Sequence, residues 1–185
     1  MGALRGDLPV ALCGFMGVGK TSIGRRVAAA LGRAFVDSDA LIVAEIGMSI
    51  ADFFAAEGEA RFRQIEAETI ASALGRRPPV VLALGGGALG DEGTRALLLE
   101  EALLVHLDQP FSELRSALPA LRRGRPLLAE ATEEEVRALF EARRSLYAVA
   151  PVQVTLRRRG VVVAAEQVLA AIGATRPTPT DPAPR

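Results

Sequence analysis

Five short apolar runs, separated by longer segments with helical spacing, limit what this chain of 185 residues can fold into. Each run has the length of a β-strand. The runs are residues 10–13, 34–36, 80–84, 103–107 and 152–156. Strands that alternate with helices form parallel sheets covered on both faces, and the continuous apolar character of residues 80–84 is what an interior strand requires. The sequence therefore predicts an α/β fold.

Several helix boundaries can also be predicted. Apolar residues recur at four-residue intervals from Ile23 to Leu31, and Gly32 follows as a stop signal. Ser49 and Thr132 each lie three residues before a carboxylate, which is the pattern of a capping box. We therefore expect one helix to end before Gly32 and two others to begin after Ser49 and Thr132.

The composition favours one domain, residues 1–174, and a balanced charge that creates no strong electrostatic field. Half of the residues are hydrophobic, and 22 Lys plus Arg balance 22 Asp plus Glu. A neutral chain is not drawn to nucleic acid or to an anionic membrane, so any anion must be held by local groups. Residues 175–185 lack the apolar side chains that folding requires, and we predict a disordered tail there.

Cysteine content and apolar segment length bear on the location of the protein. Cys13, the single cysteine, can form no internal disulfide, which suits a reducing compartment. The first residues contain no apolar stretch of signal length, and no later run approaches the roughly 20 residues of a membrane span. We therefore predict a cytoplasmic protein with no membrane partner.

The segment Gly14-x-x-x-x-Gly19-Lys20-Thr21 has the full pattern of a phosphate-binding loop between a predicted strand and a helix. Its glycines allow consecutive backbone N–H groups to point at phosphate oxygens, and the helix start adds a positive dipole end. Lys20 would neutralise the outer phosphates, and Thr21 would offer its hydroxyl to Mg²⁺. The residues predicted to hold ATP are Gly17, Val18, Gly19, Lys20, Thr21 and Ser22.

This loop does not identify the phosphoryl acceptor, which could be water, a protein, a nucleotide or a metabolite. Asp37 and Asp39 follow the second predicted strand, at the end where ligands gather in parallel sheets. One carboxylate near the magnesium ion and another against an acceptor hydroxyl would suit phosphoryl transfer. The alternative for either aspartate is a turn and a helix cap.

Arg63 and Glu66 share one face of a predicted helix, and Gly85, Gly86 and Gly87 directly follow the interior strand. A guanidinium held by a carboxylate is a good clamp for a carboxylate ligand, although such a pair is also common as a surface ion pair. The glycines leave room for a ligand to approach the backbone, or they form only a tight turn. Both features are therefore candidates for an acceptor site.

A basic segment lies at residues 117–129, where two prolines and a glycine interrupt any long helix. We predict a mobile segment there, and it contains Arg125-Pro126-Leu127-Leu128. A late helix carries Arg143-Arg144-x-x-Tyr147. Each of these two motifs alone could also belong to a solvated surface.

Six motifs occur in an order that resembles the shikimate kinase family. They are the phosphate loop, Asp37-Ser38-Asp39, Phe62-Arg63-x-x-Glu66, the triple glycine, Arg125-Pro126-Leu127-Leu128 and Arg144-x-x-Tyr147. The resemblance spans about residues 9–172. It implies a P-loop fold like that of the nucleoside monophosphate kinases, with a five-stranded parallel sheet in the order 2-3-1-4-5, flanking helices and a mobile lid.

The resemblance also implies an activity, which is transfer of the γ-phosphoryl group of ATP to the 3-hydroxyl of shikimate in chorismate and aromatic amino-acid biosynthesis. In that reaction Asp39 would orient the acceptor hydroxyl, Arg63 and Arg144 would hold the shikimate carboxylate, and the three glycines would line the pocket. Asp37 would support the magnesium ion through its water shell. Shikimate is the expected partner, and the protein is expected to act as a monomer.

By the same resemblance, Arg125 would move in with the lid, at about residues 117–129, and contact the transferred phosphate and the substrate. Lys20 and Asp39 complete the expected catalytic set with Arg125. Arg115 is a candidate for contact with the adenine of ATP. The segment between Arg115 and Arg125 is longer than the family pattern, and the residues near 157–160 give no firm match to an adenine-binding loop, so the adenine contacts stay open.

Other functions remain as alternatives. A gluconate kinase or a nucleotide kinase would share the phosphate loop, but gluconate would not account for the other motifs as a set. A module that binds ATP without turnover could dispense with Lys20, Asp39 or Arg63, and all three are present. Nucleic-acid binding would rest on the arginine clusters alone, against a zero net charge and few aromatic residues.

Overall fold

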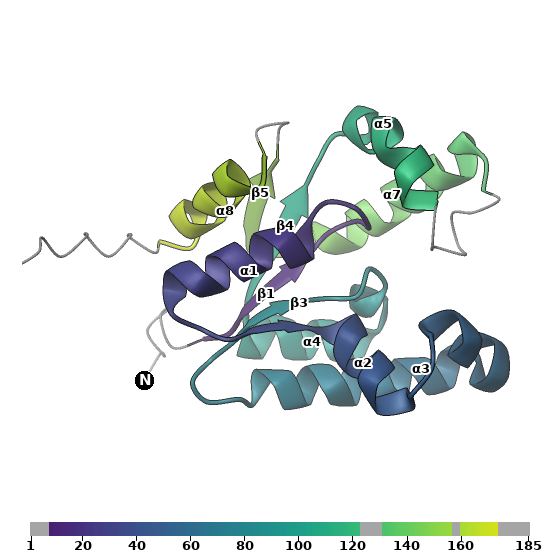
Figure 1. Ribbon diagram of the computed structural model, residues 1–185, viewed down its shortest axis with the longest axis horizontal. Helices are drawn as coiled ribbons and strands as arrows, with labels where there is room; N and C mark the ends of the chain where they lie inside the picture. The colour runs from purple at the N-terminus through teal and green to yellow at the C-terminus, as the bar shows by residue number, and fades with distance from the viewer. Residues whose placement is uncertain (1–7, 123–130, 157–159, 174–185) are drawn as a thin grey trace, which may run out of the picture.

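Five parallel strands form one sheet in the order β2-β3-β1-β4-β5 in the computed structural model, which describes residues 8–122, 131–156 and 160–173 (Figure 1). The strands are β1 (Val10–Cys13), β2 (Phe35–Asp37), β3 (Val81–Ala83), β4 (Leu103–Asp108) and β5 (Val152–Thr155). Each pair of neighbours is parallel. The predicted α/β class and strand order are confirmed, and the predicted tail lies outside the described residues.

The central strand β1 explains why the first apolar run is continuous. Its four residues are at most 2% exposed. Val10 and Leu12 belong to one buried cluster, and Ala11 and Cys13 belong to another, because successive side chains of a strand point to opposite faces. Cys13 is therefore a core residue, and burial raises the pKa of its thiol to about 12.

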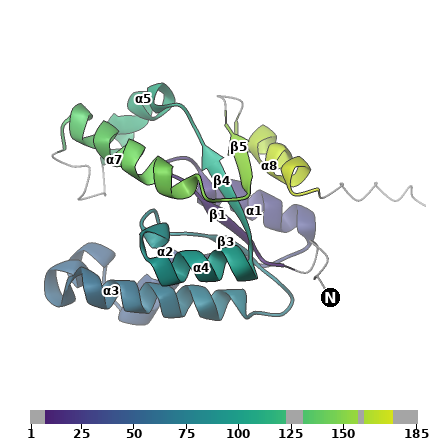
Figure 2. The same ribbon diagram turned by 180° about the vertical axis from the view of Figure 1, so that it is seen from behind.

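Helices cover both faces of the sheet. Helices α1 (Lys20–Leu31) and α8 (Gly160–Ala171) pack together on one face (Figure 1). Helices α3 (Ile50–Leu74), α4 (Glu92–Glu101) and α7 (Glu133–Tyr147) lie on the other face, seen from behind (Figure 2). The sheet is thus the middle of three layers, as expected for parallel strands joined by helical crossovers.

Three further elements lie near the carboxyl ends of the strands. They are α2 (Ser38–Ile46), the 3₁₀-helix η2 (Ala88–Gly90) and α5 (Phe111–Arg122). Helix α2 packs against α3 through a separate apolar cluster that includes Ile42, Phe53, Phe62 and Ile65. Because Phe62 is 3% exposed, the orientation of this part of α3 is fixed by packing.

The register between β2 and β3 brings two predicted site segments together. Strand β2 ends at Asp37, one residue later than predicted, and Asp37 is paired with Ala83 of β3. Asp39 and Gly85 each follow two residues after these paired positions. Neighbouring parallel strands end at the same edge of the sheet, so the two segments start side by side.

The expected helix boundaries are confirmed. Gly32 ends α1 in the left-handed conformation, with φ of 65°. The Ser49 hydroxyl accepts the backbone N–H of Asp52 at 3.1 Å and caps α3. Thr132 and Glu135 form the full reciprocal capping box at the start of α7.

The expected interruption of the basic segment is wrong for its first residues. Helix α5 continues to Arg122 with Pro119 inside it, so residues 117–122 are helical. Proline removes one backbone donor but its fixed φ is close to that of a helix, and α5 ends three residues later. Residues 123–130, which include Arg125, lie outside the described residues.

In the described part of the chain, no helix combines the length and the apolar character that crossing a membrane would need.

Thr69, in α3, carries a buried hydroxyl with no hydrogen-bond partner among the described residues. Thr69→Val keeps the branched shape and removes the unsatisfied polar atom. We predict that it raises the free energy of unfolding by about 1 kcal/mol, because an unpaired buried polar group costs ~1–3 kcal/mol. Urea unfolding followed by circular dichroism measures the change.

The matched control is Thr94→Val. Thr94 is also buried, but its side chain bonds to Asp91 at the start of α4. This variant should lose stability. A loss in Thr69→Val as large as that in Thr94→Val would show that the Thr69 hydroxyl is paired in solution.

Candidate active site

The phosphate loop lies between the end of β1 and the start of α1. Gly14, Gly17 and Gly19 have φ angles of 144°, 85° and 96°, a region that favours glycine. A Cβ on Gly14 would also lie 2.6 Å from the carbonyl oxygen of Leu107 in β4. The glycines of this motif are therefore required both by the turn and by the close approach to β4.

Lys20 begins α1 and reaches back over the loop. Its Nζ donates to the carbonyl oxygen of Gly14 at 2.8 Å and to that of Phe15 at 3.3 Å. Gly19 caps α1 without a side-chain hydrogen bond, so the first turn presents its backbone N–H groups and its positive dipole end. The residues predicted to bind ATP phosphates lie together in this loop and first turn: Gly17, Val18, Gly19, Lys20, Thr21 and Ser22.

Thr21 and Asp37, the two predicted magnesium residues, are in contact. The Thr21 hydroxyl donates to Oδ2 of Asp37 at 2.8 Å. Asp37 also caps α2 by accepting the N–H of Ala40 at 3.4 Å, so the cap alternative holds alongside the contact with Thr21. Two oxygen donors next to a phosphate loop suit Mg²⁺, which takes its remaining ligands from water and phosphate. Among the described residues, no group of three or more His, Cys, Asp or Glu could hold a metal by itself.

Arg63 is held by two carboxylates of its own helix. Its guanidinium pairs with Glu59 at 2.9 Å and with Glu66. Glu66 is 2% exposed. Burial raises the pKa of Glu66, and the Asp39 carboxylate adds to this, while Arg63 and Arg143 act to lower it. The Arg63 guanidinium is therefore held in position by a buried carboxylate, and the two residues do not form a simple surface ion pair.

The triple glycine brings these charged groups to one place. A Cβ on Gly85 would lie 2.5 Å from Oδ1 of Asp39 and 2.8 Å from Oε1 of Glu66. A Cβ on Gly87 would lie 2.6 Å from Nη2 of Arg63. The side chains of Asp39, Glu66 and Arg63 therefore occupy the space that Cβ atoms on Gly85 and Gly87 would need.

Arg143 of α7 supplies a second cation at the same glycines. Its Nη1 would lie 2.8 Å from a Cβ on Gly86. The Arg143 cation also acts to lower the pKa values of Glu66 and Tyr147, so its charge lies near both residues. Two guanidinium groups from different helices therefore face a glycine loop that also contacts two carboxylates, an arrangement suited to a small anion with hydroxyl groups.

Comparisons with known proteins agree with this arrangement. The family model for shikimate kinase matches residues 16–172. A shikimate kinase of Geobacillus kaustophilus is 40% identical over 164 residues, which cover 88% of this chain and 87% of the relative. A solved shikimate kinase of Acinetobacter baumannii in complex with shikimate has a TM-score of 0.81 and 33% identity, covering 90% of this chain and 93% of that one.

This chain belongs to the shikimate kinase family. A gluconokinase of Sinorhizobium meliloti also matches, with a TM-score of 0.59 and 20% identity over 92% of this chain and 94% of that one. That likeness shows only a shared fold. The comparisons therefore favour the shikimate kinase family over the alternative sugar-acid kinase.

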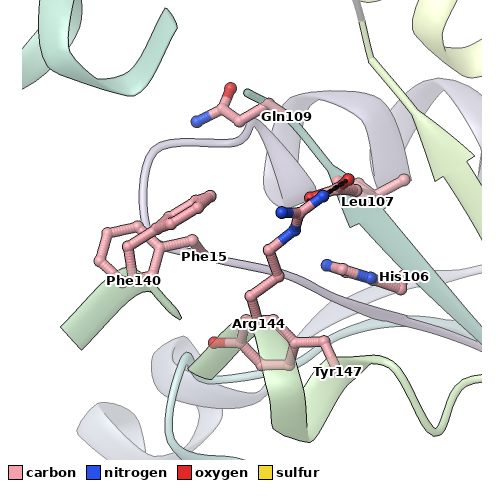
Figure 3. Close-up of a pocket in the computed structure, with 8 residues that line it drawn as sticks. Phe15, His106, Leu107, Gln109, Phe140, Arg144 and Tyr147 are labelled. Carbon is pink, nitrogen blue, oxygen red and sulfur yellow. Dashed lines mark hydrogen bonds and ion pairs between the residues drawn. The ribbon is translucent and has the colours of Figure 1, made fainter. Parts of the chain in front are cut away.

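One residue predicted from the family resemblance is placed elsewhere. Arg144 lies away from the triple glycine, and it pairs with Asp108 at the end of β4 through two hydrogen bonds of 3.1 and 3.0 Å. Figure 3 shows Arg144 extending past the ring of Tyr147 toward Leu107, while the Tyr147 hydroxyl points the other way. The structure therefore places Arg143, and not Arg144, beside the triple glycine, and the clamp role of Arg144 stays a prediction.

The physical reason for these different positions is helical geometry. Adjacent residues of a helix point about 100° apart, so Arg143 and Arg144 leave α7 in different directions. Arg143 and Tyr147 are four residues apart and share a face of α7. Tyr147 is 2% exposed and lies against the glycine loop, so this four-residue spacing is the sequence signal that could have pointed to Arg143.

Two candidates from the sequence analysis remain, Arg115 and Arg125. Arg115 is exposed in α5 and pairs with Glu133 at the start of α7 at 3.1 Å. Its contact with adenine stays a prediction. Arg125 lies outside the described residues, and its role stays a prediction as well.

Gly87→Ala tests whether the convergence on the triple glycine matters in this shikimate kinase family member. The backbone of Gly87 (φ −103°, ψ −8°) is open to any residue, and the atoms nearest to the new Cβ would belong to the flexible end of Arg63. We predict a protein of normal stability whose KM for the phosphoryl acceptor rises about tenfold, as expected when one hydrogen bond to a charged group is lost.

Gly90→Ala is the control, because a Cβ at Gly90 meets nothing within 4 Å. Steady-state kinetics and thermal unfolding of both variants give the comparison. An equal KM in the two variants would mean that Arg63 is not displaced from a functional position.

Proposed function

We propose that this protein transfers the γ-phosphoryl group of ATP to the 3-hydroxyl of shikimate, giving shikimate 3-phosphate and ADP. The observation that carries the proposal is the turn of Asp37, Ser38 and Asp39, which joins the two halves of the site. Asp37 bonds to Thr21 behind the phosphate loop, and Asp39 lies against Gly85 in the charged cluster. Donor and acceptor groups thus meet at one edge of the sheet.

The acceptor half suits a small carboxylate that carries hydroxyl groups. Arg63 and Arg143 can hold a carboxylate from two helices, and a planar guanidinium matches this group well. Glu59 and Glu66 fix Arg63 before the ligand arrives, so little conformational entropy is lost on binding. The relative from Acinetobacter baumannii was solved in complex with shikimate, which supports this choice of acceptor.

Asp39 is suited to act on the acceptor hydroxyl. Its carboxylate stands in the first turn of α2, beside Gly85 and Glu66. We assign it to orient the 3-hydroxyl and to accept its proton as the oxygen attacks the γ-phosphorus. Phosphoryl transfer depends mainly on such positioning and on neutralising charge.

The donor half holds the triphosphate. Backbone N–H groups from Gly17 to Ser22 and the Lys20 ammonium would bind its oxygens, with Thr21 and Asp37 placed to hold Mg²⁺ and its waters. The ion would neutralise charge on the phosphates. Lys20 now bonds to two loop carbonyls, so its Nζ already lies over the curve of the loop where phosphates would sit.

The lid also belongs to this proposal. Water competes with the acceptor for the phosphoryl group, so a segment that completes the site over bound shikimate would suppress hydrolysis of ATP. Residues 117–129 with Arg125 are assigned this role from the sequence. A monomeric state and a cytoplasmic location complete the proposal.

ADP release with different acceptors tests the activity. We predict that shikimate stimulates ADP release and that gluconate and nucleoside monophosphates do not. Lys20→Ala should abolish the stimulation because the charge over the phosphates is lost. Stimulation by gluconate or a nucleotide, without shikimate, would replace the proposed acceptor.

Arg143→Ala and Arg144→Ala form a matched pair on α7. We predict that Arg143→Ala raises the KM for shikimate by roughly 10- to 100-fold, since a hydrogen bond to a charged group contributes ~1.5–3 kcal/mol. Arg144→Ala should change this KM by less than about threefold, because its guanidinium is held by Asp108. The reverse order of the two effects would restore Arg144 as the clamp.

A further inference from the structure

Two buried hydroxyl groups hold the triple-glycine loop from opposite sides. The Ser38 hydroxyl accepts the backbone N–H of Gly85 at 2.9 Å. The Tyr147 hydroxyl donates to the carbonyl oxygen of Gly86 at 2.6 Å. Ser38 is 0% exposed and Tyr147 is 2% exposed, and neither is among the groups assigned above to ATP or to the acceptor.

Tyr147 is fixed from behind by the sheet. Its ring lies 5.2 Å from the ring of His106 in β4. His106 Nδ1 is 2.6 Å from Oε1 of Gln153 in β5, and Gln153 Nε2 donates to the carbonyl oxygen of Ala150 at 2.8 Å. The strands and the chain after α7 therefore hold the tyrosine ring in one place.

The ionisation states of this group suit a hydrogen-bond donor. Burial raises the pKa of Tyr147 to about 12, although the Arg143 cation opposes the change, so the phenol keeps its proton at neutral pH. Burial also lowers the pKa of His106, in spite of the hydrogen bond to Gln153 and the charge of Asp108. A neutral imidazole therefore stands behind a protonated tyrosine.

The Tyr147 hydroxyl and the Arg143 guanidinium both lie close to Gly86. A Cβ on Gly86 would be 2.8 Å from Nη1 of Arg143 and 3.9 Å from the Tyr147 hydroxyl. Gly86 C=O and Gly87 N–H belong to one planar trans peptide and point in opposite directions. The bond from Tyr147 thus sets the direction of the Gly87 N–H as well as that of the Gly86 carbonyl.

We propose that Tyr147, with Ser38 on the other side, is a positioning residue for acceptor binding. Its hydroxyl holds the Gly86 peptide beside Arg143 in the geometry that receives the acceptor, and it does so without touching the acceptor. The proposal rests on the proposed function. We therefore expect a change at Tyr147 to alter the KM for shikimate alone, because Lys20 and Asp39 are held by other elements.

Tyr147→Phe tests this proposal, since it keeps the ring against His106 and removes only the hydroxyl. The expected result is a rise of about five- to tenfold in KM for shikimate, the effect of one neutral hydrogen bond of ~1 kcal/mol. The kcat and the KM for ATP should stay within about twofold. Thr69→Val, which removes a buried hydroxyl in a different helix, α3, is the control and should leave all three constants unchanged.

A double-mutant cycle separates positioning from a general loss of structure. In the Arg143→Ala background, Tyr147→Phe should raise KM by less than about twofold, because the Gly86 peptide is then no longer held beside a guanidinium that binds the acceptor. An unchanged KM in the single variant, a fall in kcat as its main effect, or full additivity with Arg143→Ala would each overturn the proposal.

If Tyr147→Phe does not fold with a near-normal melting temperature, Ser38→Ala decides in its place, with the same rise in KM as support and an unchanged KM as refutation. If the unmodified protein phosphorylates an acceptor other than shikimate, the proposed function fails. The positioning role is then tested with that acceptor: Tyr147→Phe should raise its KM and leave kcat and the KM for ATP nearly unchanged.

Discussion

The absence of three Cβ atoms at residues 85–87 is the constraint on which the site depends. Charged side chains from α2, α3 and α7 approach this backbone to distances that any larger residue would block. The parallel sheet makes the meeting possible, because β2 and β3 end at the same edge with Asp37 and Ala83 in register. A turn in the backbone thus becomes the centre of an acceptor site.

Charge balance explains why the cluster can be partly buried. An isolated buried carboxylate such as Glu66 would be costly, and its raised pKa reflects that burial. Arg63 offsets this cost and is itself oriented by Glu66 and Glu59. The acceptor site is therefore preorganised by groups that also stabilise one another. Arg144 lies apart from this cluster and pairs with Asp108 at the end of β4.

Much of the fold could be predicted because its signals are local. The alternation of apolar runs with helical spacing predicted the strands, and the capping box at Thr132 predicted the start of α7. The passage of α5 through Pro119 could not be predicted in this way. A proline weakens a helix locally, and the packing of buried residues such as Leu114 and Leu118 against the core outweighs this effect.

The sequence by itself determined the phosphate loop and the residue types of the acceptor site. The loop can be read from the chain alone, because its glycines, Lys20 and the hydroxyl that follows Lys20 occur at fixed spacing. Only the tertiary structure shows that Arg143, and not Arg144, lies beside the triple glycine. Both have the same charge and the same neighbours in sequence, but α7 packs on the sheet through Tyr147, and this packing turns one arginine toward Gly86 and the other toward Asp108. The direction of a side chain depends on what its helix is packed against, which no local pattern contains.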